Sequence, residues 1–126
     1  MNNWLFDTNA LLWFFTGNKR MLPVLDMLKL PNTQVYISTV SWWEIALKTK
    51  AGKLPVDISS LASFTEEYNF IELPLNRTHI EAYMELLVLH KDPFDHMLLS
   101  QAISSHMRLI TGDAILAEYS SLVMVV

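Results

Sequence analysis

Short apolar runs alternate with helical patterns along the whole chain. The apolar runs contain few polar residues, which is typical of strands that are buried on both faces. Between them, apolar residues recur at the three- and four-residue spacing of helices. The predicted strands are residues 4–6, 35–37, 70–73, 109–111 and 122–126. The predicted helices are residues 10–15, 21–30, 39–51, 59–68, 78–90, 93–107 and 114–119.

This alternation predicts an α/β fold, in which a central and mainly parallel sheet lies between helices. The chain has 126 residues, of which 52% are hydrophobic and 17% are charged. This length and composition fit one compact domain over residues 1–126. We expect no second domain, because the pattern contains neither a repeat nor a linker-like segment.

The formal net charge of −4 limits the kinds of partner that the chain attracts. An acidic protein has no general attraction for nucleic acid or for an anionic membrane, so a polyanion would need local positive charge or bound cations. The longest wholly apolar run, residues 10–15, is too short to cross a bilayer, and the N-terminus does not resemble a signal peptide. We therefore expect a cytoplasmic protein with no membrane partner. The lack of cysteine excludes disulfides and thiolate metal sites.

Four acidic residues fall where the predicted pattern brings separate segments to one edge of the sheet. Asp7 ends the first strand, and Asp113 follows the fourth. Glu44 lies in the second turn of the helix after the second strand, and Asp95 lies in the first turn of the helix over 93–107. Ligands of open parallel sheets bind at the carboxyl edge. We therefore expect these four carboxylates to lie close together.

Two of the four acids, and the neighbouring Asp92, also have simpler interpretations. Asp113 could cap the helix that follows it, and Asp7 could bond to nearby backbone. Asp92, which precedes Pro93, fits a helix cap better than a ligand position. Asp95 is harder to explain as a cap, because its neighbours at helical spacing are apolar.

Glu44 is the most informative of the four acids. Val40, Leu47 and Ala51 mark the expected apolar stripe of its helix, and Glu44 falls inside that stripe. A buried carboxylate is costly unless it is paired or bound to a metal. An exposed ion pair with Lys48 would contribute only about 0.3–0.5 kcal/mol, which does not explain the position.

Four converging carboxylates without a cation would raise one another's pKa values and lower the stability of the fold. Mg²⁺ and Mn²⁺ favour oxygen ligands of this type. Such ions can lower the pKa of a water and aim it at a phosphorus atom. The pattern therefore predicts a divalent-metal site with Asp7, Glu44, Asp95 and Asp113 as ligands and catalytic residues.

Four sequence blocks resemble, in order and spacing, the PIN-domain ribonucleases, and most closely the VapC-type toxins of toxin–antitoxin pairs. The blocks are residues 7–9 (DTN), 41–46 (SWWEIA), 90–99 (HKDPFDHMLL) and 111–113 (TGD). The resemblance covers essentially the whole chain. It implies a PIN-like three-layer α/β/α sandwich and Mg²⁺- or Mn²⁺-dependent endonucleolytic cleavage of RNA. It also implies homodimerisation and inhibition by a cognate antitoxin that is usually a DNA-binding repressor.

The acidic quartet of the family corresponds to the same four carboxylates. Thr8, Asn9 and Thr111 correspond to polar supports near the metal. The sequence departs from the family at residue 9, which is often His in near relatives, and at residue 96, which is commonly Arg. The second departure, to His96, removes a fixed positive charge beside the site.

Other residues suggest contacts with RNA or with a protein partner. We interpret His96 as a candidate phosphate contact. Lys48 could contact RNA together with Lys50 and Lys53, although a solvated helix end is the commoner role of such a cluster. The tryptophans at positions 13, 42 and 43 fit either an antitoxin groove or the core.

Two other functions remain open from the sequence. The first is a catalytically silent PIN-like interaction module, which would normally have lost at least one of the four acids. The second is a phosphoacceptor receiver domain, which is also α/β and binds Mg²⁺. A receiver would need an acceptor Asp at the end of a middle strand and a Lys after a late strand, and the pattern does not provide them.

Overall fold

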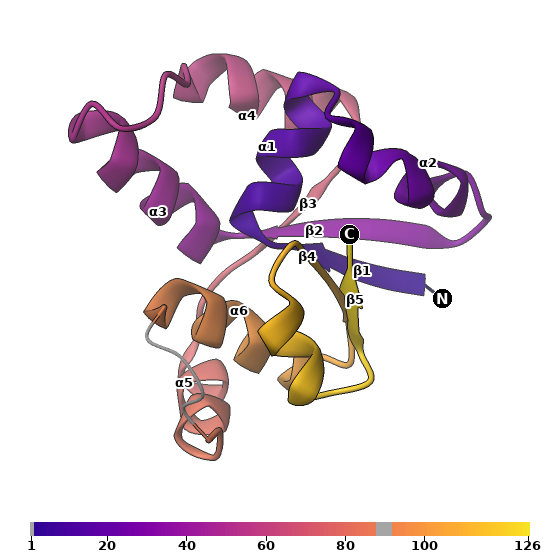
Figure 1. Ribbon diagram of the computed structural model, residues 1–126, viewed down its shortest axis with the longest axis vertical. Coiled ribbons are helices and arrows are strands. Elements are labelled where there is room, and N and C mark those ends of the chain that lie inside the picture. The colour runs from indigo at the N-terminus through magenta and orange to yellow at the C-terminus, as the bar shows by residue number, and fades with distance from the viewer. Residues whose placement is uncertain (1, 88–91) are drawn as a thin grey trace.

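The computed structural model describes residues 2–87 and 92–126, which form a parallel sheet between two groups of helices (Figure 1). The five-stranded sheet has the order β3-β2-β1-β4-β5, and every neighbouring pair is parallel. The strands are β1 (Asn2–Phe6), β2 (Thr33–Ser38), β3 (Ile71–Leu73), β4 (Arg108–Thr111) and β5 (Val123–Val125). The predicted α/β class and the parallel sheet are confirmed.

The two groups of helices cover opposite faces of the sheet, as Figure 1 shows. Right-handed crossovers explain this division, because the chain adds β2 and β3 on one side of β1 and then β4 and β5 on the other. The first face carries α1 (Thr8–Thr16), η1 (Lys19–Met21), α2 (Leu22–Leu28), α3 (Thr39–Lys50) and α4 (Ile58–Glu67). The second face carries α5 (Arg77–Met84), α6 (Pro93–Ser104) and η2 (Ala114–Glu118).

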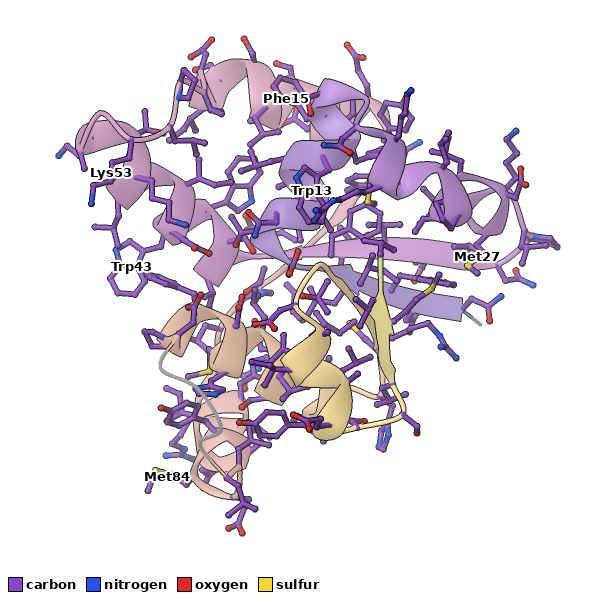
Figure 2. The ribbon with its side chains drawn as sticks, viewed as in Figure 1. Trp13, Phe15, Met27, Trp43, Lys53 and Met84 are labelled. Carbon is purple, nitrogen blue, oxygen red and sulfur yellow. The ribbon has the colours of Figure 1, made fainter. Side chains whose placement is uncertain are left out.

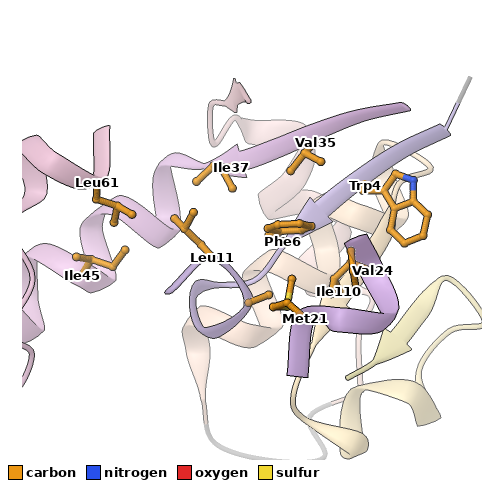
Figure 3. Close-up of a cluster of buried hydrophobic side chains, with 11 residues drawn as sticks. Trp4, Phe6, Leu11, Met21, Val24, Val35, Ile37, Ile45, Leu61 and Ile110 are labelled. Carbon is orange, nitrogen blue, oxygen red and sulfur yellow. The ribbon is translucent and has the colours of Figure 1, made fainter. Parts of the chain in front are cut away.

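Successive side chains of the central strand enter two separate cores. Trp4 and Phe6 of β1 pack with α1, α2 and the facing residues of β2, as Figure 3 shows. Leu5, between them, packs on the opposite face with Leu98 and Leu99 of α6. Because both faces are covered, an apolar run rather than an alternating pattern specifies this strand.

Several helices differ from their predicted limits. The helix predicted over 21–30 is divided into the 3-10 turn η1 and the helix α2, which has a proline in its first turn. The segment 114–119 is the short 3-10 helix η2 rather than an α-helix. Helix α6 ends at Ser104 rather than at 107, because His106 has a left-handed φ of 54° and turns the chain toward β4.

The helix predicted over 78–90 ends at Met84 as α5, where the Glu85 N–H bonds back to the carbonyl of Ala82. The end of that prediction, with His90 and Lys91, lies outside the described residues. Within residues 2–87 and 92–126, no helix has the length and apolar character needed to cross a membrane.

The strand order places a topological switch between β1 and β4. The chain leaves β1 toward β2 and leaves β4 toward β5, so the connections depart in opposite directions. A crevice for ligands forms at the carboxyl ends of such strands. The receiver fold has the strand order 2-1-3-4-5, which differs from the order observed here, so this alternative is excluded.

Candidate active site

Asp7 lies at the carboxyl end of β1, on one side of the switch point. Its backbone N–H donates to the carbonyl of Ile110 in β4 at 3.0 Å, which joins the ends of the two strands. Its Oδ1 accepts the N–H of Ala10 at 2.7 Å and caps α1. Only 3% of Asp7 is exposed. The strand end and the helix cap therefore fix this carboxylate in a buried position next to the positive end of a helix.

Thr111 supports the acids on both sides of the switch point. It ends β4 and is fully buried. Its Oγ1 accepts the N–H of Asp113 at 3.0 Å, and a hydrogen bond between its side chain and Asp7 favours the ionised form of that carboxyl. The supporting role that the resemblance implied for Thr111 agrees with these contacts.

Asp113 follows β4 and begins η2. One carboxylate oxygen accepts the N–H of Ile115 at 3.0 Å, so the capping interpretation of this residue is correct. Asp7 also caps a helix, and because a carboxylate has several lone pairs, an oxygen that accepts a hydrogen bond can still be a metal ligand. The capping role and the predicted site role of Asp113 are therefore compatible.

Glu44 reaches the same edge from α3. The hydroxyl of Ser38 caps this helix by accepting the N–H of Val40 at 3.0 Å. The Thr8 hydroxyl donates to the Ser41 hydroxyl at 3.0 Å, in a buried contact that joins the first turn of α1 to α3. Since Glu44 lies one turn after Ser41, this contact fixes its distance from the start of α1.

The burial of Glu44 is confirmed, but the stripe used to predict it was wrong. Leu47 is 45% exposed, and Ala51 is exposed as well. The buried residues of α3 are Val40, Ser41, Glu44 and Ile45. The helix is rotated relative to the expectation because its polar Ser41 and Glu44 face the carboxyl edge, whereas its apolar Leu47 faces solvent.

Glu44 is 5% exposed and only half satisfied by hydrogen bonds. Its Oε2 accepts from Lys48 Nζ at 2.7 Å, so the ion pair weighed above as an alternative does form. Its Oε1 is buried and has no hydrogen-bond partner. An unpaired carboxylate oxygen in a buried position is costly, and a cation would remove that cost.

Asp92 and Asp95 lie at the start of α6. Oδ1 of Asp92 accepts the N–H groups of Phe94 at 3.0 Å and Asp95 at 3.3 Å, so Asp92 is the predicted helix cap. Helix α6 leads to the amino end of β4, so its first turn lies at the carboxyl edge of the sheet. The half-buried Asp95 therefore reaches the same edge as the other three acids.

The pKa values of two of these acids report how closely the four approach. Burial raises the pKa of Asp7 to about 6, and the charge of Glu44 adds to the increase against the hydrogen bonds from Thr111 and Ala10. Burial also raises the pKa of Asp95 to about 8, with further increases from the charges of Asp92, Asp7, Glu44 and Asp113. Asp95 is therefore within electrostatic reach of the other three predicted ligands, and Asp7 is within reach of Glu44.

The donor set fits a hard divalent cation. It consists of carboxylate oxygens, which Mg²⁺ and Mn²⁺ prefer, and it contains the unpartnered Oε1 of Glu44. No three acidic or histidine side chains within 2–87 and 92–126 already stand in ligating positions around one point.

The remaining predicted site residues have different surroundings. Thr8 is buried and bonded to Ser41, whereas Asn9 is exposed on the first turn of α1. Lys48 is half exposed and lies near several acids. Its hydrogen bond with Glu44 and the charges of Glu44, Asp92 and Asp95 raise its pKa. Its predicted contact with RNA stays a prediction.

The expected phosphate contact of His96 conflicts with its environment. The residue is 2% exposed, and its Nε2 lies 3.2 Å from the hydroxyl of Tyr119. Its ring also packs near Tyr83, at a centroid distance of 6.3 Å. Since Asp95 faces the site, the next residue of α6 points about 100° away around the helix, into the packing with α5 and η2. The buried ring of His96 is therefore not in a position to contact an RNA phosphate.

The sequence interpretation missed two contacts that shape the site. The hydroxyl of Ser41 holds α3 against α1, although the residue was named only as part of a sequence block. Gly112 packs under the indole of Trp13, where an added Cβ would lie 2.3 Å from Cη2 of the ring. A glycine between Thr111 and Asp113 was the only sequence signal for this close approach.

A family model for the PIN domain matches residues 4–122. The chain belongs to the PIN domain family. The resemblance to PIN domains inferred from the four sequence blocks is thereby confirmed. The matched segment contains all four predicted ligands.

Solved structures of similar fold include components of toxin–antitoxin complexes. One is a chain from VapBC2 of Rickettsia felis bound to promoter DNA, to which this chain is 15% identical, with a TM-score of 0.71. The match covers 98% of this chain and 97% of that chain. This chain is 22% identical to one from a toxin–antitoxin complex of Klebsiella pneumoniae, with a TM-score of 0.67 and coverage of 95% and 94%. At these identities the likeness establishes the fold. A search of curated proteins gave no match.

Proposed function

We propose that this PIN domain is a divalent-metal-dependent endoribonuclease that acts as the toxin of a toxin–antitoxin pair. The observation that carries the proposal is Oε1 of Glu44, which is buried and has no hydrogen-bond partner within the described residues. The expected approach of Asp7, Asp95 and Asp113 to the same edge supports it, since the charges of Asp7, Glu44 and Asp113 all act on Asp95. A silent interaction module has no need for four carboxylates that destabilise one another. The family match and the fold shared with VapBC chains support the same function.

The residues would divide the reaction among them as follows. Asp7, Glu44, Asp95 and Asp113 would hold Mg²⁺ or Mn²⁺ at the carboxyl edge. A cation bound there supplies Lewis-acid chemistry, lowering the pKa of a water and neutralising charge on the scissile phosphate. Thr111 keeps Asp7 ionised and holds the backbone of Asp113. Thr8 and Ser41 keep α1 and α3 at a fixed separation, which sets the distance between Asp7 and Glu44.

Lys48 has a particular place in this proposal. Its ammonium neutralises one oxygen of Glu44 at 2.7 Å. If Glu44 held a metal ion instead, the half-exposed Lys48 could turn toward solvent, where its ammonium would be able to contact an RNA phosphate.

The proposed partners follow from the same family. We propose RNA as the substrate, a cognate antitoxin as the inhibitor, and a homodimer acting in the cytoplasm. The neighbouring structures from Rickettsia felis and Salmonella typhimurium are VapBC assemblies bound to DNA. For this chain, the matching observation would be a small reading frame beside its gene that encodes a DNA-binding protein.

The deciding experiment is cleavage of RNA by the purified protein in the presence of Mn²⁺ or Mg²⁺. We expect fragments that disappear with EDTA and with Asp7→Asn, while growth of cells expressing the wild type stops and growth of cells expressing Asp7→Asn continues. Absence of cleavage with Mn²⁺, together with equal growth of the two strains, would refute the nuclease and favour the silent interaction module.

A further inference from the structure

A cation lies beside the acidic edge without belonging to it. The guanidinium Cζ of Arg20 lies 4.7 Å from the centroid of the Trp13 ring. Trp13 lies centrally in Figure 2, on α1 above the sheet, and its indole packs on Gly112. Gly112 separates Thr111 from Asp113. Arg20 is therefore one aromatic ring away from the segment that carries part of the predicted metal site.

The backbone around Arg20 is built to hold it there. Gly17, at a left-handed φ of 72°, ends α1, and the N–H of Asn18 bonds back to the carbonyl of Trp13 at 2.8 Å. The side chain of Asn18 then accepts the N–H of Arg20 at 2.9 Å. The next residue, Met21, is 2% exposed and anchors the turn in the core. This turn returns the chain over Trp13, so Arg20 is positioned by the fold rather than by its own flexible side chain.

Apart from its contact with Trp13, the guanidinium of Arg20 has no acidic partner within the described residues. It is exposed, and the one ion pair within residues 2–87 and 92–126 joins Lys48 to Glu44. A guanidinium that lies over an aromatic ring keeps its N–H groups directed outward from its edge. These donors match the geometry of a phosphate, which they can bind through two parallel hydrogen bonds.

The net charge makes such a cation valuable. The formal charge is −4, and the catalytic edge adds to the repulsion of a polyanion. Lys48 supplies positive charge on the α3 side of the edge, where it contacts Glu44. Arg20 supplies it on the other side, next to the β4–η2 segment. An RNA strand crossing the edge would meet one cation on each side of the carboxylates.

We propose that Arg20, held on the indole of Trp13, binds a backbone phosphate of single-stranded RNA adjacent to the cleaved one. Arg20 is thus a positioning residue for the substrate. The inference rests on the proposed ribonuclease function and extends it. It predicts that Arg20 acts on substrate binding and contributes one phosphate contact, whereas the chemical step stays with the carboxylates.

The chain contains a matched control for this test. Arg108, at the start of β4, lies with Cζ 5.7 Å from the centroid of Trp4. It thus makes the same kind of contact with a tryptophan, but at the amino end of its strand, away from the carboxyl edge. Arg20→Gln and Arg108→Gln remove the same charge and the same type of stacking, so net charge alone affects both variants equally.

The test compares KM, kcat and salt dependence with a random pool of single-stranded RNA at a fixed Mn²⁺ concentration. We expect Arg20→Gln to raise KM roughly fivefold with kcat within about twofold of the wild type, and to reduce the slope of log affinity against log salt by about 0.7, which is one phosphate contact on a single strand. Arg108→Gln should match the wild type. Fluorescence anisotropy with the pool and Asp7→Asn protein provides the affinity without cleavage.

Trp13→Leu is the second variant, since it removes the aromatic support and keeps the charge of Arg20. We expect it to raise KM as well, and the double variant with Arg20→Gln should raise KM less than the product of the two single effects. Thermal unfolding checks that each variant is folded. Equal values of KM and of the salt slope for Arg20→Gln and Arg108→Gln would overturn the role of Arg20. If the wild type still cleaves RNA in that case, the proposed ribonuclease function stands. A wild type that neither binds nor cleaves RNA would overturn both.

Discussion

At the scale of single residues, the site is a group of carboxylates whose burial opposes their charge. Asp7 and Asp95 have raised pKa values because the fold desolvates them and brings like charges near them. Glu44 contributes a buried oxygen that no donor satisfies. Each of these features lowers the stability of the protein, and each would be relieved by a divalent cation, as the proposed function requires.

Glu44→Gln tests this conflict directly. We expect cleavage of RNA to be lost while the fold persists, because the substitution keeps the size of the side chain and removes one charge from the cluster. Thermal unfolding in EDTA should occur at the same temperature as in the wild type or at a higher one. The control is Glu67→Gln on the exposed end of α4, which should leave both properties unchanged. An unfolded Glu44→Gln protein with unaltered metal affinity would mean that Glu44 is structural.

The raised pKa values predict how stability without metal depends on pH. Burial raises the pKa of Asp7 to about 6 in the folded protein, against an ordinary value of 3.8 for an aspartate carboxyl. The folded state therefore holds this proton more tightly than the unfolded state. Its contribution to the free energy of unfolding is complete below about pH 3.8 and is lost as pH rises through about 6, with an upper size of about 3 kcal/mol. Asp95 extends the same loss toward its pKa of about 8.

We therefore expect the unfolding temperature in EDTA to fall as pH rises from 5 to 8, and Mn²⁺ to restore it most strongly at the upper end. Asp7→Asn should weaken the decrease at its acid end. Differential scanning fluorimetry over this range, with EDTA or Mn²⁺, gives the measurement. An unfolding temperature that does not vary with pH or Mn²⁺ in the wild type would contradict the electrostatic account of the site.

At the scale of elements, close contacts between α1, α3 and the β4–η2 segment hold the site together. Gly112→Ala is the sharpest test, since the added Cβ would lie 2.3 Å from Cη2 of Trp13. We expect a loss of about 1–3 kcal/mol in the free energy of unfolding, typical of overpacking, and weaker cleavage because Thr111 and Asp113 move. Urea unfolding measures the first effect. In a Trp13→Leu background the same substitution should cost much less, and an equal cost would exclude this contact as the cause.

A second set of contacts connects the helices of the other face to the start of α3. The Ser38 hydroxyl, which caps α3, donates to Oε1 of Gln101 in α6 at 2.6 Å. The Gln101 amide lies 3.3 Å from Nδ1 of the buried His79 in α5. The N–H of Asn76 also donates to this nitrogen at 3.2 Å, so His79 is neutral with its proton on Nε2.

Gln101→Leu should therefore destabilise the protein by about 1–3 kcal/mol, because the buried hydroxyl of Ser38 loses its acceptor and the ring of His79 loses one of its two contacts at Nδ1. Urea unfolding at pH 7.5 measures the change. Ser105→Ala is the control. Its hydroxyl lies 3.5 Å from Nε2 of the same histidine, at the limit of a hydrogen bond, so we expect a smaller loss. Equal losses for the two variants would argue against a network that passes through Gln101.

At the scale of the whole molecule, charge and topology act together. A protein with a formal charge of −4 does not attract RNA by its net charge, so its affinity should depend on bound cations. We expect the wild type to bind a random pool of single-stranded RNA more weakly in EDTA than in Ca²⁺ at equal ionic strength, Mg²⁺ being avoided because it would permit cleavage. Fluorescence anisotropy with the Asp7→Asn protein should show a smaller difference, since one ligand is altered. Equal affinity of the wild type for RNA in EDTA and in the divalent cation would show that metal ions do not contribute to RNA binding.

The sequence alone determined the class of the fold and the four acids. Buried strands of a parallel sheet are apolar on both faces, so short apolar runs between helical patterns indicated the α/β architecture. Asp7 and Asp113 follow directly from strand ends, and a rule about the carboxyl edge of parallel sheets was enough to place them together. Glu44 and Asp95 were identified by their apolar neighbours at helical spacing, and the correspondence of four ordered blocks to PIN domains then covered all four acids.

The tertiary structure decided which faces of the helices are buried and which side chains meet. Periodicity gives an apolar stripe, but packing fixes its rotation, so Leu47 is exposed and Ser41 is buried against Thr8. His96 appeared suited to a phosphate, yet the packing of α5 and η2 around α6 buries it. The contact of Trp13 with Gly112 joins residues far apart in sequence, and the contact of Arg20 with Trp13 depends on the turn that follows α1. Only the folded chain brings them to the edge where Asp7 ends the first strand.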